Sequence, residues 1–162
     1  ACARCCVARW CRPCAKPVPE GRSGDNGHMQ IEEKSPFDTP FEWLGGEARV
    51  QELTDRFYDL MDLESAYKAL RAAHGSQLDD ARNKLFWFLC GWLGGPNHYI
   101  ERFGHPRLRA RHMPFMIGIQ ERNEWLACMD QAMAETQVPQ ALRERLLVSF
   151  YETADWMRNT PG

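Results

Sequence analysis

The sequence predicts an all-α domain, and three observations lead to this prediction. Apolar residues recur three and four positions apart from about residue 50 onwards, which is the period of a helix with one buried face. No stretch of any length alternates apolar and polar residues in the way of a half-buried strand. Glycine and proline clusters interrupt the periodic segments, as short loops between helices do. We therefore expect several helices packed around one core.

The first two helices should be separated by a glycine pair. Residues 37–44 form a short turn of helix that stops at Gly45-Gly46, because glycine leaves the helical conformation easily. A longer helix is expected over residues 47–62, and Tyr58 lies on the shoulder of its buried face. That face consists of Val50, Leu53, Phe57, Leu60 and Met61.

A short helix should follow over residues 64–73. Its inner side is expected to carry Ala66, Tyr67 and Leu70. We expect His74-Gly75 to end this helix, because glycine adopts the left-handed cap conformation at no steric cost.

A stronger helical pattern comes next. Ser76-x-x-Asp79 is typical of a helix start, and Gly94-Gly95-Pro96 stops the helix abruptly. The apolar face between these signals is wide and comprises Leu78, Ala81, Leu85, Phe88, Leu89 and Trp92.

The C-terminal half should contain four further helical segments. A turn of helix is expected over residues 98–103, and the next helix must be short because it lies between Pro106 and Pro114. A helix over about residues 120–135 should turn Trp125, Leu126, Met129 and Met133 inward. Pro139 suits the first position of the last helix, whose buried side carries Leu142, Leu146, Phe150 and Met157.

Length, charge and hydropathy limit the kinds of partner and location that we expect for this protein. The chain has 162 residues, of which 44% are hydrophobic, so one domain can bury a real core. The net charge is -2 and gives no indication of a nucleic-acid or anionic-membrane partner. No apolar run reaches the roughly 18 residues of a transmembrane helix, and residues 1–30 lack the apolar core of a secretory signal. We expect a cytoplasmic protein with no membrane partner.

Residues 1–36 differ in character from residues 37–162, which should form the folded domain. The first segment is rich in cysteine, proline and glycine and poor in large apolar residues, which favours a disordered extension. Translation from upstream of a true start at Met29 would give the same composition. Alternatively, Cys2-x-x-Cys5 and Cys11-x-x-Cys14 supply four thiolates to zinc or an iron-sulfur cluster. Two further cysteines, Cys90 and Cys128, sit in helical patterns as ordinary thiols.

The segment from His105 to Phe115 carries the most chemistry. Two histidines and three arginines lie there within eleven residues, and His112 lies on the short helix between the prolines. A fixed imidazole flanked by arginines suits an anionic ligand that carries a metal. The ordinary alternative is a histidine that caps a helix. The sequence has no His-Glu-x-x-His, glycine-rich phosphate loop or nucleophile elbow, so hydrolase and nucleotide functions have no support.

From Phe37 to its end, the chain resembles the group II truncated haemoglobins. The resemblance implies an all-α, two-over-two helical sandwich around haem b, in which glycine pairs end the first helix and the long distal helix. It rests on four segments in the right order: Arg56-Phe57-Tyr58, Trp92-Leu93-Gly94-Gly95-Pro96, Gly104 to Phe115, and Glu121-Arg122-Asn123-Glu124-Trp125-Leu126-x-Cys128-Met129.

The resemblance implies a role for each of four residues near the iron. His112 matches the proximal ligand, whose other ring nitrogen should bind a backbone carbonyl. Tyr58 matches a tyrosine that donates a hydrogen bond to bound oxygen, and Trp125 matches an indole donor. His74 falls where the family has Phe, Tyr or His, in a link of variable length. From the residues alone, Tyr58 and Trp125 would be aromatic core and His74 a helix cap.

The resemblance also implies which residues surround the haem. Ala81 matches a position where many globins carry histidine, and its methyl group offers no hydrogen bond. Lys84 and Arg111 match cations that face the haem propionates, although each would otherwise be an ordinary solvated charge. The remaining pocket residues would be Leu85, Phe88, Leu89, Met113, Phe115, Leu126 and Met129.

The implied function is reversible binding of O2, and of NO and CO, at a five-coordinate haem iron. Tight O2 binding would suit redox chemistry or sensing better than transport, and turnover as an NO dioxygenase or peroxidase would need a reductase or a reducing substrate. The alternative from another class is a non-haem helical module in which His98, His105 and His112 bind a metal or a partner. A monomer and a homodimer both remain open.

Overall fold

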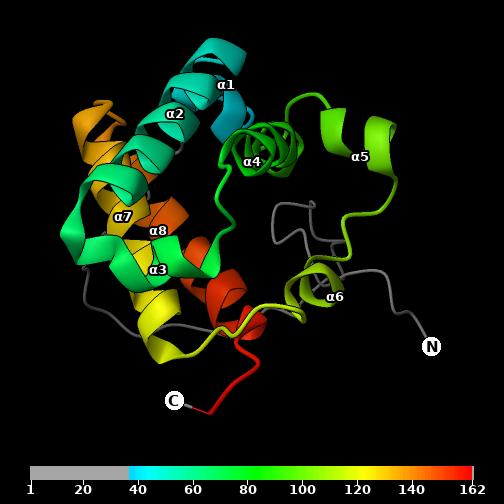
Figure 1. Cartoon of the computed structure of the whole chain (residues 1–162). Coiled ribbons are helices and arrows are strands. Elements are labelled where there is room, and N and C mark those ends of the chain that lie inside the picture. Colours follow the sequence, from blue (N-terminus) through cyan, green and yellow to red (C-terminus); the bar gives the residue numbers. More distant parts are fainter. Residues whose placement is uncertain (1–36, 162) are drawn as a thin grey trace, which may run out of the picture. The chain divides into compact units, whose positions relative to one another are not determined.

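The computed structural model describes residues 37–161, and the predictions for the cysteine-rich segment concern residues outside this range. Within this range every regular element is a helix, which confirms the all-α prediction (Figure 1). The elements are α1 (Pro40–Leu44), α2 (Glu47–Leu63), the short 3-10 helix η1 (Ser65–Tyr67), α3 (Lys68–Ala73), α4 (Asp79–Trp92), α5 (His98–Phe103), α6 (Leu108–His112), α7 (Ile119–Glu135) and α8 (Gln140–Met157).

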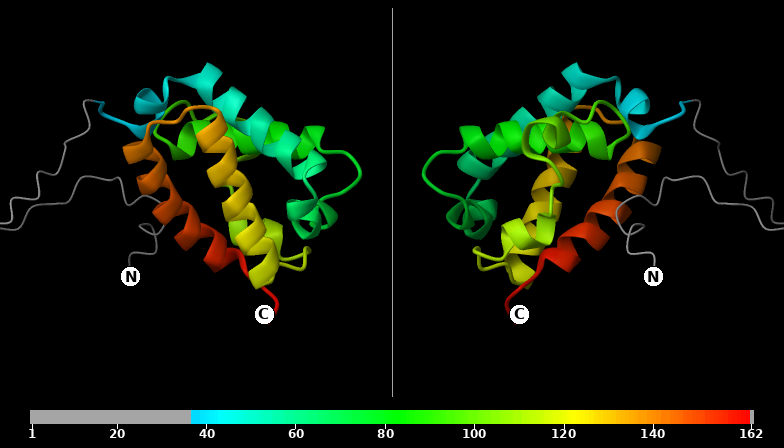
Figure 2. Two further views of the ribbon diagram at one scale, coloured as in Figure 1. Left: turned by 90° about the vertical axis from the view of Figure 1, so that its left-hand side faces the viewer. Right: turned by 90° about the vertical axis from the view of Figure 1, so that its right-hand side faces the viewer.

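The long helices form two layers of two. Helices α2 and α4 pack together in one layer, and α7 and α8 pack side by side in the other (Figure 2). Contacts between α2 and α7 join the layers, while α6 packs against α8. This is the two-over-two sandwich that the sequence predicts. None of the described helices is both long and apolar enough to span a lipid bilayer.

The core lies between the layers and follows the predicted helical spacing. The side chains of Phe57 and Met129 are fully buried, and Cys128 donates from its thiol to the Phe57 carbonyl over 3.3 Å. Both Cys90 and Cys128 are free thiols inside this core. The other fully buried large side chains are Val50, Leu53, Leu60, Met61, Leu89, Leu93, Met133, Leu142 and Leu146.

The glycine breaks lie where the chain passes close to itself. Gly45 ends α1 in the left-handed conformation, with φ of 111°. After α4, Gly94 also has positive φ, and the backbone N–H of Phe41 donates to the carbonyl of Leu93 over 3.0 Å. A β-carbon on Gly95 would lie 2.6 Å from the Phe41 ring, so only glycine fits beneath the first helix.

The predicted end of α3 at residue 73 is confirmed, but the predicted left-handed glycine cap is wrong. Gly75 does not adopt the left-handed conformation, and His74 ends the helix with extended backbone angles of φ -94° and ψ 149°. The His74 backbone N–H donates to the Arg71 carbonyl, while its ring binds the Leu70 carbonyl. His74 thus supplies hydrogen-bond donors to two carbonyls at the end of α3, a function that a left-handed glycine cap performs in many helices. The predicted helix over 64–73 is also divided into η1 and α3, which leaves Ala66 exposed.

Two predicted helix starts also need correction. Leu78, rather than Ser76, precedes α4, and no side chain caps that helix. Pro139 comes immediately before α8 instead of occupying its first position. At the N-terminus, α1 begins at Pro40 because the Thr39 hydroxyl accepts from the backbone N–H of Glu42.

Candidate functional site

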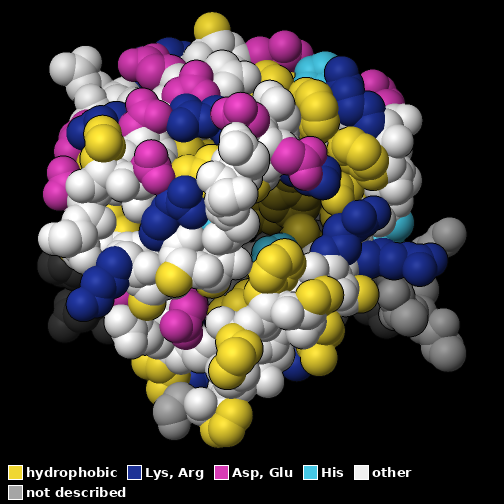
Figure 3. Space-filling view, viewed as in Figure 1, with side chains coloured by type: hydrophobic (Ala, Val, Ile, Leu, Met, Phe, Trp, Pro, Cys, Tyr) yellow, Lys and Arg dark blue, Asp and Glu magenta, His cyan; other side chains and the backbone are white. Residues whose placement is uncertain are grey.

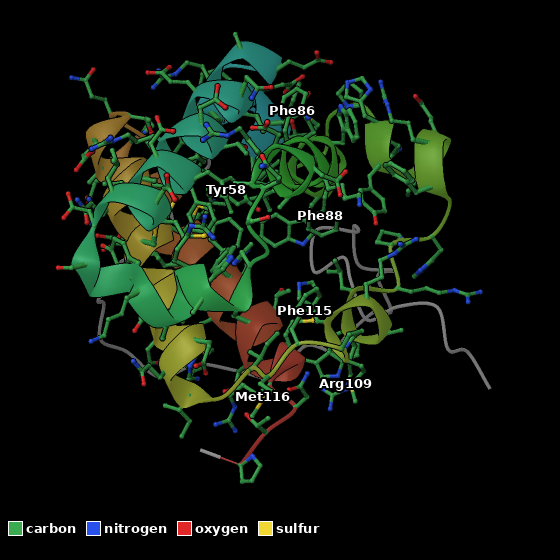
Figure 4. All side chains as sticks on the ribbon, viewed as in Figure 1. Tyr58, Phe86, Phe88, Arg109, Phe115 and Met116 are labelled. Carbon is green, nitrogen blue, oxygen red and sulfur yellow. The ribbon has the colours of Figure 1, made fainter. Side chains whose placement is uncertain are left out.

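A hollow opens on one face of the molecule between α4 and α6. Figure 3 shows it floored by hydrophobic side chains, with a histidine and cationic side chains at its edge. In the same view, Tyr58 of α2, Phe88 of α4 and Phe115 from the loop after α6 lie around it (Figure 4). The sequence separates these three residues widely, and the packing of the layers brings them to one place.

His112 ends α6 and is half-buried. Its ring Nδ1 lies 2.7 Å from the carbonyl oxygen of Leu108. A carbonyl only accepts, so Nδ1 is the donor of this bond and Nε2 is left for another partner. The backbone thus fixes the orientation of the ring, as it does for metal-binding histidines.

Tyr58 and Trp125 are two aromatic residues that carry a hydrogen-bond donor, and both pack in or against the core. Tyr58 is only 4% exposed, and its ring meets the edge of the His74 ring at a centroid distance of 5.9 Å. Neither the Tyr58 hydroxyl nor the Trp125 indole N–H has a hydrogen-bond partner within residues 37–161, and neither atom is sealed from solvent. Both donors are thus free to bind a ligand that reaches them.

The surroundings of Tyr58 keep it protonated. Burial raises the pKa of the phenol, and the nearby Arg82 guanidinium, 5.6 Å from the ring centre, only partly opposes this. Arg82 is itself fixed by Asp55 and Asp59 across α2. Sequence patterns do not identify Arg82, because the spacing of residues within one helix does not show which residues of α2 and α4 form ion pairs.

His74 is half-buried and repeats the geometry of His112. Its Nδ1 donates to the Leu70 carbonyl over 2.9 Å, which leaves Nε2 as an acceptor. Burial lowers the pKa of His74 below its usual 6.5; the bond to Leu70 opposes this, and the charges of Arg71 and His112 add to it. The ring is therefore neutral near pH 7, within electrostatic range of His112.

The other predicted pocket residues divide by exposure. Leu89 and Met129 are fully buried in the core, whereas Met113 and Phe115 are 55% and 47% exposed after α6. Four more are half-buried and pack against the core from α4 and α7: Ala81, Leu85, Phe88 and Leu126. The predicted pocket residues thus include buried or half-buried core residues and two exposed apolar residues that follow α6.

The two predicted propionate cations have protein partners. Lys84 binds Asp80 one turn earlier over 2.6 Å. Arg111 donates from Nε to the Pro106 carbonyl over 2.9 Å and lies over the Tyr99 ring. Both Lys84 and Arg111 have partly solvent-exposed side chains, so a carboxylate ligand can still reach their charges.

The three histidines of the non-haem alternative do not converge. In the described part of the chain, no group of three or more histidine, cysteine, aspartate or glutamate side chains could hold a metal ion. His98 binds Glu47 over 2.8 Å, and His105 accepts from the backbone N–H of Arg107 over 3.1 Å. A shared metal site for His98, His105 and His112 is therefore wrong.

Comparisons with known proteins agree with this geometry. The sequence profile of the bacterial-like globin family matches residues 39–159. Group 2 truncated hemoglobin YjbI of Bacillus subtilis is 37% identical over 123 residues, which cover 76% of this chain and 90% of that protein.

Solved structures give the same result. The group II 2-on-2 hemoglobin of Agrobacterium tumefaciens superposes with a TM-score of 0.75 at 41% identity, covering 79% of this chain and 98% of that one. The cold-adapted truncated hemoglobin of Pseudoalteromonas haloplanktis TAC125 gives a TM-score of 0.73 at 43% identity, with 75% and 98% covered.

Proposed function

The chain belongs to the bacterial-like globin family as a group II truncated haemoglobin, and on this basis we propose that it binds O2 reversibly, and also NO and CO. The proposed cofactor is haem b, held by His112, and the proposed globin domain is residues 37–162. The observation that carries the proposal is an apolar hollow bordered by Tyr58 and Phe88, together with an imidazole, His112, that a backbone carbonyl holds at Nδ1.

The residues around the hollow fit a haem. His112 offers Nε2 to the iron, and apolar side chains of α4 and α7 offer contact to the flat ring. Lys84 and Arg111 are the proposed partners of the two propionates, because a cation can bind a carboxylate by charge-assisted hydrogen bonds. When bound, haem would supply an iron that can bind both the His112 imidazole and a diatomic gas.

Tyr58 and Trp125 are the proposed hydrogen-bond donors to that gas. An indole N–H can only donate, so it favours a ligand that gains negative charge, as O2 does, over neutral CO. Ala81 has a methyl group where a polar side chain would otherwise compete. His74 donates from Nδ1 to the Leu70 carbonyl and meets Tyr58 only through a ring contact, so the single hydroxyl hydrogen of Tyr58 is left for the gas.

Two such donors would slow O2 release. Each good hydrogen bond contributes about 1–3 kcal/mol, which corresponds to roughly tenfold to hundredfold in the release rate. Slow release suits redox chemistry on NO, peroxide or O2, or sensing, better than bulk transport. Catalytic turnover would require electrons from a reductase or a reducing substrate.

Stopped-flow measurement of O2 release tests the proposed donor. Trp125→Phe removes the N–H and keeps an aromatic ring, so release should accelerate by roughly tenfold to hundredfold. Trp43→Phe is the matched control, because Trp43 lies on α1 against Arg145 and outside the hollow. Equal release rates in wild type and Trp125→Phe would exclude this donor.

A further inference from the structure

The chain that follows α8 runs beside the loop that follows α6. The backbone N–H groups of Asn159 and Thr160 both donate to the carbonyl of Ile117, over 3.0 and 3.2 Å. Figures 1 and 2 show this end of α8 approaching α6. Two segments more than forty residues apart in sequence thus form one local structure next to His112.

The side chain of Asn159 is fully engaged there. Its Nδ2 donates to the carbonyl of His112 over 3.0 Å and to that of Phe115 over 2.7 Å. Its Oδ1 accepts from the backbone N–H of Ile117 over 3.0 Å. Both amide hydrogens and the amide oxygen are therefore used on the short segment from His112 to Ile117.

Arg109 makes a second connection between the same elements. It donates to the backbone carbonyls of Trp156 and Arg158, the latter over 3.3 Å, and lies over the Trp156 ring at 5.8 Å. We name Arg109 and Asn159 together the α6 clamp. Arg109 connects the first turn of α6 to the end of α8, and Asn159 binds His112, the last residue of α6.

Helix α6 depends on such connections. It has five residues, none of them buried, and prolines lie close to both of its ends. A helix this short is not stable by itself, because too few of its hydrogen bonds offset the cost of the first turn. The position of His112 is therefore set by the contacts of α6 with its neighbours.

We propose that Asn159 is a positioning residue for His112, an inference that rests on the proposed role of His112 as the iron ligand. The ring of His112 is held at Nδ1 by Leu108, and its backbone is held at the carbonyl by Asn159. Together these bonds set the height and tilt at which Nε2 meets the haem. Removing the second one leaves the ring oriented within α6 while α6 itself can shift.

Two substitutions separate the parts of the Asn159 amide. Asn159→Leu removes every side-chain hydrogen bond at similar size. Asn159→Asp keeps an acceptor for the Ile117 N–H but has no donor for the His112 and Phe115 carbonyls. Asn123→Asp makes the same chemical change on an exposed position of α7, where the described structure records no side-chain hydrogen bond.

Resonance Raman spectra of the ferrous, ligand-free protein test the proposal through the iron–histidine stretching band. We expect this band to shift in both Asn159 variants and not in Asn123→Asp. We also expect haem to transfer to apomyoglobin about tenfold faster from the Asn159 variants, as for other partners of metal-binding histidines. Lower thermal stability with an unchanged band would mean a purely structural role and would overturn the proposal.

The same spectra distinguish the positioning role of Asn159 from the proposed role of His112 as the iron ligand. If wild type lacks an iron–histidine band, or if His112→Gly retains one, then His112 is not the ligand. If wild type shows the band and His112→Gly loses it, unchanged spectra of both Asn159 variants overturn the positioning role alone.

Discussion

His74 and His112 make the same local hydrogen bond. Each ring donates from Nδ1 to the carbonyl four residues earlier, so Nε2 of each is left for another partner. The surroundings of the two rings differ. His112 is the proposed iron ligand, while His74 lies against the edge of the Tyr58 ring. We expect His74 to hold the Tyr58 ring through this contact, which leaves the single hydroxyl hydrogen of Tyr58 for the gas.

The lowered pKa of His74 predicts how the free energy of unfolding depends on pH. Burial holds this pKa below 6.5 in the folded protein, so the unfolded chain binds the proton more tightly. The contribution of His74 to the free energy of unfolding therefore decreases as the pH falls below about 6.5 towards the lower folded value. In His74→Gln this decrease is absent. Urea denaturation at about pH 7 and about pH 5.5 should show a smaller pH effect in the variant than in wild type.

An equal pH effect in His74→Gln and wild type would contradict this account of His74. The comparison between the two proteins removes the contributions of other titrating groups, which both share. The sequence places a histidine at this position but does not show its tautomer, because the Leu70 carbonyl becomes its partner only when α3 forms.

Helix ends show where the sequence is informative and where it is not. The apolar period places the bodies of α2, α4, α7 and α8 within about one to three residues of their observed bounds. Caps are less predictable, because they depend on side-chain hydrogen bonds that the period does not contain. His74 displaced Gly75 as the cap of α3 for this reason.

The glycine after α4 gives a prediction about packing between helices. Gly95→Ala should lower the free energy of unfolding by about 1–3 kcal/mol, because the new methyl group would meet the Phe41 ring at 2.6 Å and α1 would have to move. Gly75→Ala is the matched control, since its position has an ordinary φ and no heavy atom within 4 Å of the new methyl group. Urea denaturation measures both. A comparable loss in Gly75→Ala would show that the Phe41 contact is not the cause.

Trp125 and His112 are held in different ways by the fold. Trp125 of α7 is held by Phe57 of α2 and Phe150 of α8, each at a centroid distance of 5.4 Å, so this proposed donor stands in an aromatic core. His112 is instead on a short, exposed helix that α8 and the residues after it hold in place. The proposed gas donor is thus built into the core, while the proposed iron ligand lies on an element attached to it.

Motifs allowed the sequence to nominate His112, Tyr58 and Trp125, because each lies in a segment typical of the family. Asn159 and Arg82 were missed for a physical reason. Asn159 contacts His112 from 47 positions along the chain, and Arg82 contacts Asp55 from 27 positions along it. Such partners are set by how helices pack, which a local pattern does not contain.

Haemin titration followed by absorption spectroscopy tests most directly whether His112 holds the haem. Wild type should bind one haem and develop a strong Soret band, and His112→Gly should lose the ferrous spectrum of a histidine-bound haem. Added imidazole should restore that spectrum by occupying the space of the missing side chain. His105→Gly, in the same segment but bonded to the Arg107 backbone, should behave as wild type. A His112→Gly spectrum identical to that of wild type without imidazole would contradict the account.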